Sequence, residues 1–110
     1  MDRPVELLRH AMQAYALRSR TVSANIANLD TPDYRRLSVD FEASLQRAGR
    51  HADGADAALP DARVHVEETP AMLEDELMEL ADTQMRTQLA TRALKEHFGL
   101  MRTAITGRSA

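Results

Sequence analysis

The sequence contains no cysteine, which excludes disulfide bonds and thiol chemistry. It also lacks tryptophan, and its only aromatic residues are two tyrosines and two phenylalanines. Hydrophobic residues make up 44% of the 110 residues, but many of them are alanines, which bury little area. A thick globular core is therefore not expected, and slender helical packing fits the composition better. The net charge of −3 argues against nonspecific attraction to nucleic acid or to anionic lipid.

Long apolar runs are absent as well. No segment approaches the length of a membrane span. Residues 1–6 do not have the apolar core of a cleavable signal peptide. Taken alone, these features predict a cytoplasmic protein.

The sequence shows no glycine-rich phosphate loop, no nucleophile elbow and no metal-ligand spacing. The four histidines are His10, His51, His65 and His97, and they stand in four separate contexts. His51, Asp53 and Asp56 share one segment, but a solvated loop is favoured there over a metal site. The residues therefore predict no catalytic, cofactor-binding or metal-binding site and no small-molecule substrate.

An amphipathic helix is predicted over residues 5–29, with Pro4 where a first-turn proline is tolerated. Its seam alternates spacings of three and four, as in a coiled coil, and has one polar member, Ser19. The seam consists of Val5, Leu8, Met12, Tyr15, Ser19, Val22, Ile26 and Leu29. A core helix of an ordinary bundle stays open as an alternative.

This helix has to end inside the segment 24–35, around which the rest of the chain is organised. Pro32 disfavours helical geometry in Thr31, and Asn28 can take the left-handed conformation that closes a helix. A turn is predicted from Thr31 onward with Pro32 at its second position. Because Asp33 follows the proline, a type I turn is expected rather than a type II turn, which favours glycine there.

The middle of the chain carries weaker signals. Residues 37–41 alternate apolar and polar side chains, which predicts a short extended segment. Phe41 and Leu45 share one face of a further helical turn. Residues 48–66 are small and polar with helix breakers and predict a loop, in which 63–66 could form a brief strand.

A second helix is predicted over residues 70–106, with Thr69 as its cap and Pro70 at the first helical position. Acidic residues crowd its beginning, at Glu74, Asp75, Glu76, Glu79 and Asp82. A solvated first turn that complements the helix dipole is favoured there over a cation site.

This second helix carries two apolar stripes. The first stripe consists of Leu77, Leu80, Leu94, Phe98, Met101 and Ile105, interrupted by Gln84, Thr87 and Thr91. The second stripe consists of Met78, Ala81, Met85, Leu89, Ala93, Leu100 and Ala104. Since the N-terminal helix can cover only one of them, the other is expected to meet another subunit.

The segment around the predicted turn resembles the N-terminal signature of flagellar axial proteins, the bacterial rod, hook and hook-associated proteins. The matching residues are Asn25, Ile26, Ala27, Asn28, Asp30, Thr31, Pro32, Tyr34 and Arg35. Residues 39–42 with Leu45 resemble the proximal-rod branch, the FlgB family, and residues 100–108 resemble its ending. Asp33 replaces a usual glycine, and Thr87 a usual tyrosine.

The resemblance implies a structural subunit of the proximal rod of the flagellar basal body, in the periplasm, and not an enzyme. Its terminal helices would pair and pack with neighbouring subunits in a helical tube that transmits torque. Its implied partners are other rod subunits, the adaptor at the membrane ring, and the flagellar type III export apparatus. Export would proceed without a cleaved signal peptide, and Phe41 with Leu45 would dock on the export gate. Asn25, Asn28 and Pro32 are expected to act in contacts between subunits rather than in folding.

The predicted fold is mainly α, an antiparallel, coiled-coil-like pair of long terminal helices in a single domain over residues 1–110. The pair is joined by a turn, a short extended segment and a flexible central loop. The predicted divisions are the N-terminal helix at 1–29, the turn and junction at 30–47, the central loop at 48–69 and the C-terminal helix and tail at 70–110. The alternatives are a cytoplasmic helical adaptor or regulator, another flagellar rod subunit, and a small enzyme using carboxylates or histidines, for which no constellation is visible.

Overall fold

A computed structural model of the protein describes residues 3–50 and 58–107. The described residues form the elements α1 (Arg3–Ala27), β1 (Leu37–Asp40), α2 (Glu42–Arg50), β2 (Arg63–Val66) and α3 (Leu73–Thr106). The molecule is long and flat, with extents of 60 × 31 × 15 Å. The candidate loop residues His51, Asp53 and Asp56 lie outside the described residues.

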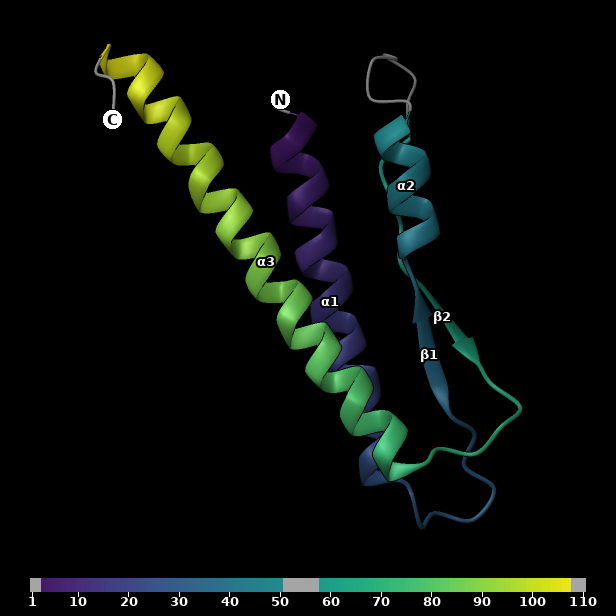
Figure 1. Cartoon of the computed structure of the whole chain (residues 1–110). Helices are drawn as coiled ribbons and strands as arrows, with labels where there is room; N and C mark the ends of the chain where they lie inside the picture. Colours follow the sequence, from purple (N-terminus) through teal and green to yellow (C-terminus); the bar gives the residue numbers. More distant parts are fainter. Residues whose placement is uncertain (1–2, 51–57, 108–110) are drawn as a thin grey trace.

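The two long helices run antiparallel, so that the end of α1 lies beside the beginning of α3 (Figure 1). Toward the other end of the molecule the helices diverge, and the last turns of α3 stand apart from the start of α1 (Figure 1). The predicted fold class, an antiparallel pair of long terminal helices, is confirmed.

α1 lies between α3 on one side and β1 with α2 on the other (Figure 1). Its buried face is therefore wider than the predicted seam. Of the seam residues, Val5, Tyr15 and Val22 are buried, whereas Leu8, Met12, Ser19, Ile26 and Leu29 are half-buried. The other buried positions of the helix are Ala11, Ala14, Arg18, Thr21 and Asn25. Because α1 is covered from two sides, a single heptad line does not include all of its buried residues. The predicted seam therefore contains only part of the buried face.

α3 faces α1 along a line of small and polar residues rather than along an apolar stripe. Its buried positions are Glu76, Thr83 and Ala90, each seven residues from the next. In the first stripe Leu80 and Leu94 are half-buried, but Leu77, Phe98, Met101 and Ile105 are exposed. Every residue of the second stripe is exposed. The prediction that the N-terminal helix covers one stripe is therefore wrong, because small and paired polar residues let the two helices approach closely and leave the large apolar ones outside.

The hydrophobic core is small and centres on an aromatic pair. Phe41 is 2% exposed, and its ring meets that of Tyr15 edge to face with centroids 5.9 Å apart. Ala11, Ala14 and Ala90 complete the buried cluster, with Leu8, Met12, Leu45 and Ala62 packed against it. Burying a phenylalanine side chain stabilises the fold by about 2–3 kcal/mol, so this pair holds the junction against the helices.

The two predicted extended segments pair with each other. β1 and β2 form an antiparallel two-stranded sheet in which Leu37 is opposite Val66 and Asp40 is opposite Arg63. The helical turn predicted after Phe41 is confirmed as the start of α2. It continues to Arg50, into residues that were predicted to be loop, because Ala48 is buried on its inner face.

The helix ends differ from the predicted ones. α1 ends at Ala27, and turns occupy residues 28–30. α3 begins at Leu73 instead of residue 70, and Met72 is its N-cap residue without a side-chain cap. Thr69 and Pro70 lie in the segment between β2 and α3, so the cap predicted for Thr69 is wrong. At the other end Gly107 closes α3 in the left-handed conformation, with φ of 68°.

Candidate functional site

Asn25 of the signature segment lies inside the molecule, 0% exposed. Its side-chain oxygen accepts hydrogen bonds from the Leu37 backbone N–H at 2.9 Å and from the Tyr34 hydroxyl at 3.0 Å. Its side-chain nitrogen donates to the Leu37 carbonyl at 2.7 Å and to Glu76 at 3.1 Å. The carboxamide thus uses both of its donors and both of its lone pairs. Asn25 fixes the start of β1 against α1 and has no capacity left for a neighbouring subunit, contrary to the prediction.

The carboxylate of Glu76 lies beside Asn25 in the interior, and Glu76 is also 0% exposed. Its Oε1 accepts from Arg36 Nε at 2.5 Å, and its Oε2 accepts from Asn25. A buried charge is tolerated when it is paired and hydrogen-bonded in this way. The predicted solvated first turn is therefore wrong for Glu76, although Glu74 and Asp75 beside it are exposed. Together Asn25, Glu76 and Arg36 join α1, α3 and the chain entering β1.

A second polar cluster is centred on Arg18, which lies seven residues before Asn25 on α1. Arg18 is 5% exposed and donates to both carboxylate oxygens of Glu42, at 2.8 and 2.6 Å, and to the Val39 carbonyl at 2.8 Å. Glu79 approaches the Arg18 Nε at 3.6 Å, and Arg86 approaches Glu42 at 3.9 Å. The bidentate hydrogen bond lowers the pKa of Glu42 and raises the pKa of Arg18. This cluster ties α2 to both long helices.

The signature loop holds itself together by local hydrogen bonds. The Asn28 side chain donates to the Ala24 carbonyl at 2.8 Å and accepts from the Thr31 hydroxyl at 3.0 Å. The Thr31 backbone N–H donates to the Asn28 carbonyl at 3.0 Å. Asn28 therefore caps the end of α1 and shapes the loop that follows.

The turn that follows Thr31 is closed by the Tyr34 backbone N–H, which donates to the Thr31 carbonyl at 3.2 Å. Asp33 has a φ of 63°. A positive φ at the residue after Pro32 is what a type II turn requires, so the predicted type I turn is wrong. Aspartate tolerates the left-handed region better than most residues do, which permits this geometry without glycine.

The remaining predicted site residues divide between surface and interior. Ala27, Thr31, Pro32 and Arg35 are exposed, and Ile26, Asn28 and Tyr34 are half-buried. In the proposed export element Phe41 is buried and Leu45 is half-buried. The signature therefore contains an inner part that anchors the sheet and an outer part that is free on the surface.

Sequence reasoning missed the partners of Arg18 and Asn25, although a signal for them was present. These two residues are seven apart and flank the buried Val22 at spacings of four and three, so all three lie on one helix face. A charged residue in the middle of a buried face requires a partner. Glu42 and Glu76, the partners themselves, are distant in sequence and could not be assigned without the fold.

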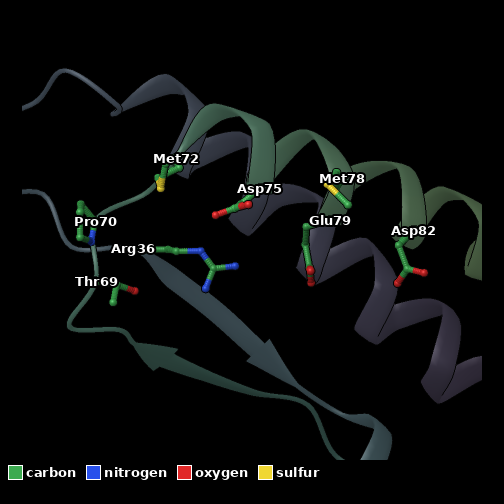
Figure 2. Close-up of a pocket in the computed structure, with 8 residues that line it drawn as sticks. All are labelled: Arg36, Thr69, Pro70, Met72, Asp75, Met78, Glu79 and Asp82. Carbon is green, nitrogen blue, oxygen red and sulfur yellow. The ribbon is translucent and has the colours of Figure 1, made fainter.

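An open hollow of about 790 Å³ lies between the sheet and the first half of α3 (Figure 2). Its lining consists of Arg36, Thr69, Pro70, Met72, Asp75, Met78, Glu79 and Asp82. Arg36 projects into it from the sheet side, opposite the acidic side chains of α3 (Figure 2). Over residues 3–50 and 58–107, no group of three histidine, aspartate or glutamate side chains is placed to hold a metal ion.

In the part of the chain that the structure describes, no helix has the length and apolar composition needed to cross a membrane. The interior is held by polar pairs, and large apolar residues stand outside along α3. Exposed apolar residues of this kind are typical of proteins that associate with other proteins.

Comparison with known proteins agrees with this class. A family model described as flagella basal body rod protein matches residues 7–35, which cover most of α1 and the signature loop. The flagellar basal body rod protein FlgB of Cereibacter sphaeroides is 32% identical over 107 residues, covering 82% of this chain and 84% of that protein. The FlgB of Bacillus subtilis is 24% identical over 120 residues, covering 94% and 93%.

Matches to spirochaete relatives are shorter. The FlgB of Borreliella burgdorferi is 34% identical over 58 residues, covering 53% of this chain and 43% of that protein. The chain thus spans less than half the length of the spirochaete relatives that it matches. Since the Cereibacter match extends over most of both chains, the chain belongs to the FlgB family of flagellar basal body rod proteins. This is a family of structural rod subunits that assemble with other basal body components.

Proposed function

We propose that this chain is a structural subunit of the proximal rod, without enzymatic activity, that assembles through its terminal helices into a helical tube and transmits torque. The observation that carries the proposal is the exposure of large apolar residues along α3 in a member of a rod protein family. Met78, Leu100 and Ile105 are 71%, 72% and 82% exposed. Packing against neighbouring subunits removes this surface from water, which stabilises an assembly by about 25 cal/mol per Å² of apolar area.

The proposed partners are further copies of the chain, other rod subunits, the adaptor between the rod and the membrane ring, and the flagellar type III export apparatus. Nucleic acid and small-molecule substrates are not among them. The surface residues of the signature loop, Ala27, Thr31, Pro32 and Arg35, are assigned to contacts with neighbouring subunits. Residues 1–110 act as one rod-subunit domain, and export to the periplasmic rod proceeds without cleavage of a signal peptide.

The proposed export element consists of Phe41 and Leu45. In the folded chain Phe41 is enclosed between Tyr15 and the neighbouring alanines, so it is not available to a receptor. Docking of Phe41 on the export gate therefore requires that the junction is separated from α1. Export accordingly precedes formation of this core.

The proposal is tested by deleting the gene in a flagellated host and restoring it on a plasmid. Cells without the chain are expected to be non-motile and to lack rods, and restored cells are expected to swim. The chain is expected outside the cytoplasm in export-competent cells and inside it when the export apparatus is disabled. Motile cells that keep the chain in the cytoplasm would contradict the proposal and favour a cytoplasmic adaptor.

A further inference from the structure

The two apolar stripes of α3 carry opposite charges. Lys95 and Arg102 accompany the first stripe, and Asp75 and Asp82 accompany the second. Among the described residues Lys95, Arg102 and Asp75 form no ion pair, and Asp82 accepts from Arg86 at 2.7 Å. One helix thus presents a basic apolar surface on one flank and an acidic apolar surface on the other.

The two surfaces also share one spacing pattern. The basic set is Lys95, Phe98, Arg102 and Ile105, and the acidic set is Asp75, Met78, Asp82 and Met85. Both sets follow steps of three, four and three residues, and each member of the basic set lies 20 residues after its counterpart. Such steps keep four residues on one helix face. Phe98, Ile105, Met78 and Met85 are all exposed in the single chain.

We infer that the basic set of one copy seats on the acidic set of the next copy, with the two α3 helices parallel and offset by 20 residues. At 1.5 Å per residue this offset is about 30 Å. In this register each basic residue faces an aspartate, Phe98 faces Met78, and Ile105 faces Met85. The inference rests on the proposed role as a self-assembling rod subunit and names the surface and register of that assembly.

Other pairings of the same helix fit less well. The basic set against itself brings lysine and arginine together, and the acidic set against itself brings aspartates together, so like charges repel. An antiparallel pairing that still matches the charges places Phe98 opposite Glu79 instead of a methionine. The parallel, offset pairing satisfies the charged and the apolar positions together.

The hollow beside α3 gives this contact room. Asp75, Met78 and Asp82 line it from the helix side, and the sheet lies across from them (Figure 2). Lys95 and Arg102 of the second copy would approach Asp75 and Asp82 from this open side of α3. The acidic set is open to a partner in the folded chain.

The contact is heterologous, because two different surfaces of the chain meet. In a row of copies, the first and the last copy each leave one surface unused, one acidic and the other basic. The association therefore repeats without limit unless it closes into a ring. A rod needs an association of this kind. A two-fold symmetric dimer would instead terminate after one contact.

The absence of cysteine makes a direct test available. A chain carrying both Phe98→Cys and Met78→Cys is oxidised in solution and in isolated basal bodies. A disulfide needs Cβ atoms about 3.8 Å apart, so it reports the proposed register. The double variant is expected to form a ladder of dimers, trimers and larger products, and a mixture of the two single variants is expected to stop at the dimer. A chain with Gln88→Cys, on the outer face, and Met78→Cys serves as the matched control and is expected to give no ladder.

Charge reversal supplies the second measurement. Lys95→Asp in the cysteine background is expected to lower the cross-linked fraction by about tenfold or more, and adding Asp75→Lys is expected to restore it. Glu74→Lys, with the same change of charge on an exposed residue outside both sets, is expected to leave it unchanged. A single cysteine variant that dimerises alone as well as the mixture does, or a chain present in basal bodies without a ladder, would overturn the inference. Absence of the chain from basal bodies would instead refute the proposed function.

Discussion

Replacing Asn25 with alanine tests the interior part of the signature most sharply. The substitution removes all four hydrogen bonds of the carboxamide. Glu76 keeps Arg36 as a partner, and the half-buried Tyr34 hydroxyl can turn to water. The backbone N–H and carbonyl groups of Leu37, at the start of β1, lose the Asn25 side chain as their partner. At about 1–3 kcal/mol for each buried group left unsatisfied, Asn25→Ala is expected to lower the free energy of unfolding by about 2–4 kcal/mol.

The assay is urea denaturation of the purified chain, followed by circular dichroism. A domain of this size has a stability of about 5–15 kcal/mol, so the expected loss shifts the midpoint strongly. Asn28→Ala is the matched control, because Asn28 is half-buried and its partner Thr31 is exposed. It is expected to cost about 1 kcal/mol or less. Equal, small losses for both variants would refute the assignment of Asn25 to folding rather than to subunit contacts.

Substitutions at three further positions probe the rest of the structure. The bond from Arg18 lowers the pKa of Glu42, so its stabilisation is fully present above the ordinary glutamate value of about 4.5 and is lost as the pH falls through the lower folded value. Urea midpoints measured against pH are expected to show this loss, and Glu42→Gln is expected to remove its pH dependence. Asp33→Gly is expected to match or exceed the stability of the natural chain, whereas Asp33→Val is expected to lose about 1–2 kcal/mol, because φ is positive there. Phe41→Ala is expected to lose about 3–5 kcal/mol of stability and to accumulate inside cells with reduced secretion; lost stability with normal secretion would leave Phe41 as a packing residue only.

The long helices and the small sheet could be predicted from the sequence because they rest on local signals. Periodic apolar residues, Pro32 and the alternation over 37–41 predicted α1, its end and β1 within a few residues. α3 was found for the same reason, although its first turn was placed three residues too early. The element types needed no knowledge of what packs against them.

The packing faces could not be predicted in the same way. Apolar periodicity indicates which residues avoid water, but it does not distinguish a partner within the chain from a partner in another subunit. Along α3 the periodic stripes are exposed, and the contact with α1 runs along Glu76, Thr83 and Ala90. The positive φ of Asp33 could not be predicted either, because glycine is the usual residue at this position of a type II turn and aspartate adopts the left-handed region less often.

The same limit applies to the candidate site. The signature was visible as a pattern of residue types, but its division into an inner anchor and an outer surface depends on contacts between residues far apart in the chain. Asn25 meets Glu76 across 51 positions, and Arg18 meets Glu42 across 24. Only the folded chain shows that Asn25 is internal while Ala27, Thr31, Pro32 and Arg35 are exposed.

The central claim, that the chain is a subunit of the proximal rod, is tested most directly by its position in isolated basal bodies. Basal bodies are purified from cells that produce a tagged chain, and the tag is located by immunogold electron microscopy. Label is expected at the end of the rod next to the membrane ring, and it is expected to remain after the outer parts of the flagellum are removed. Label confined to the soluble fraction, with unlabelled rods in motile cells, would contradict it.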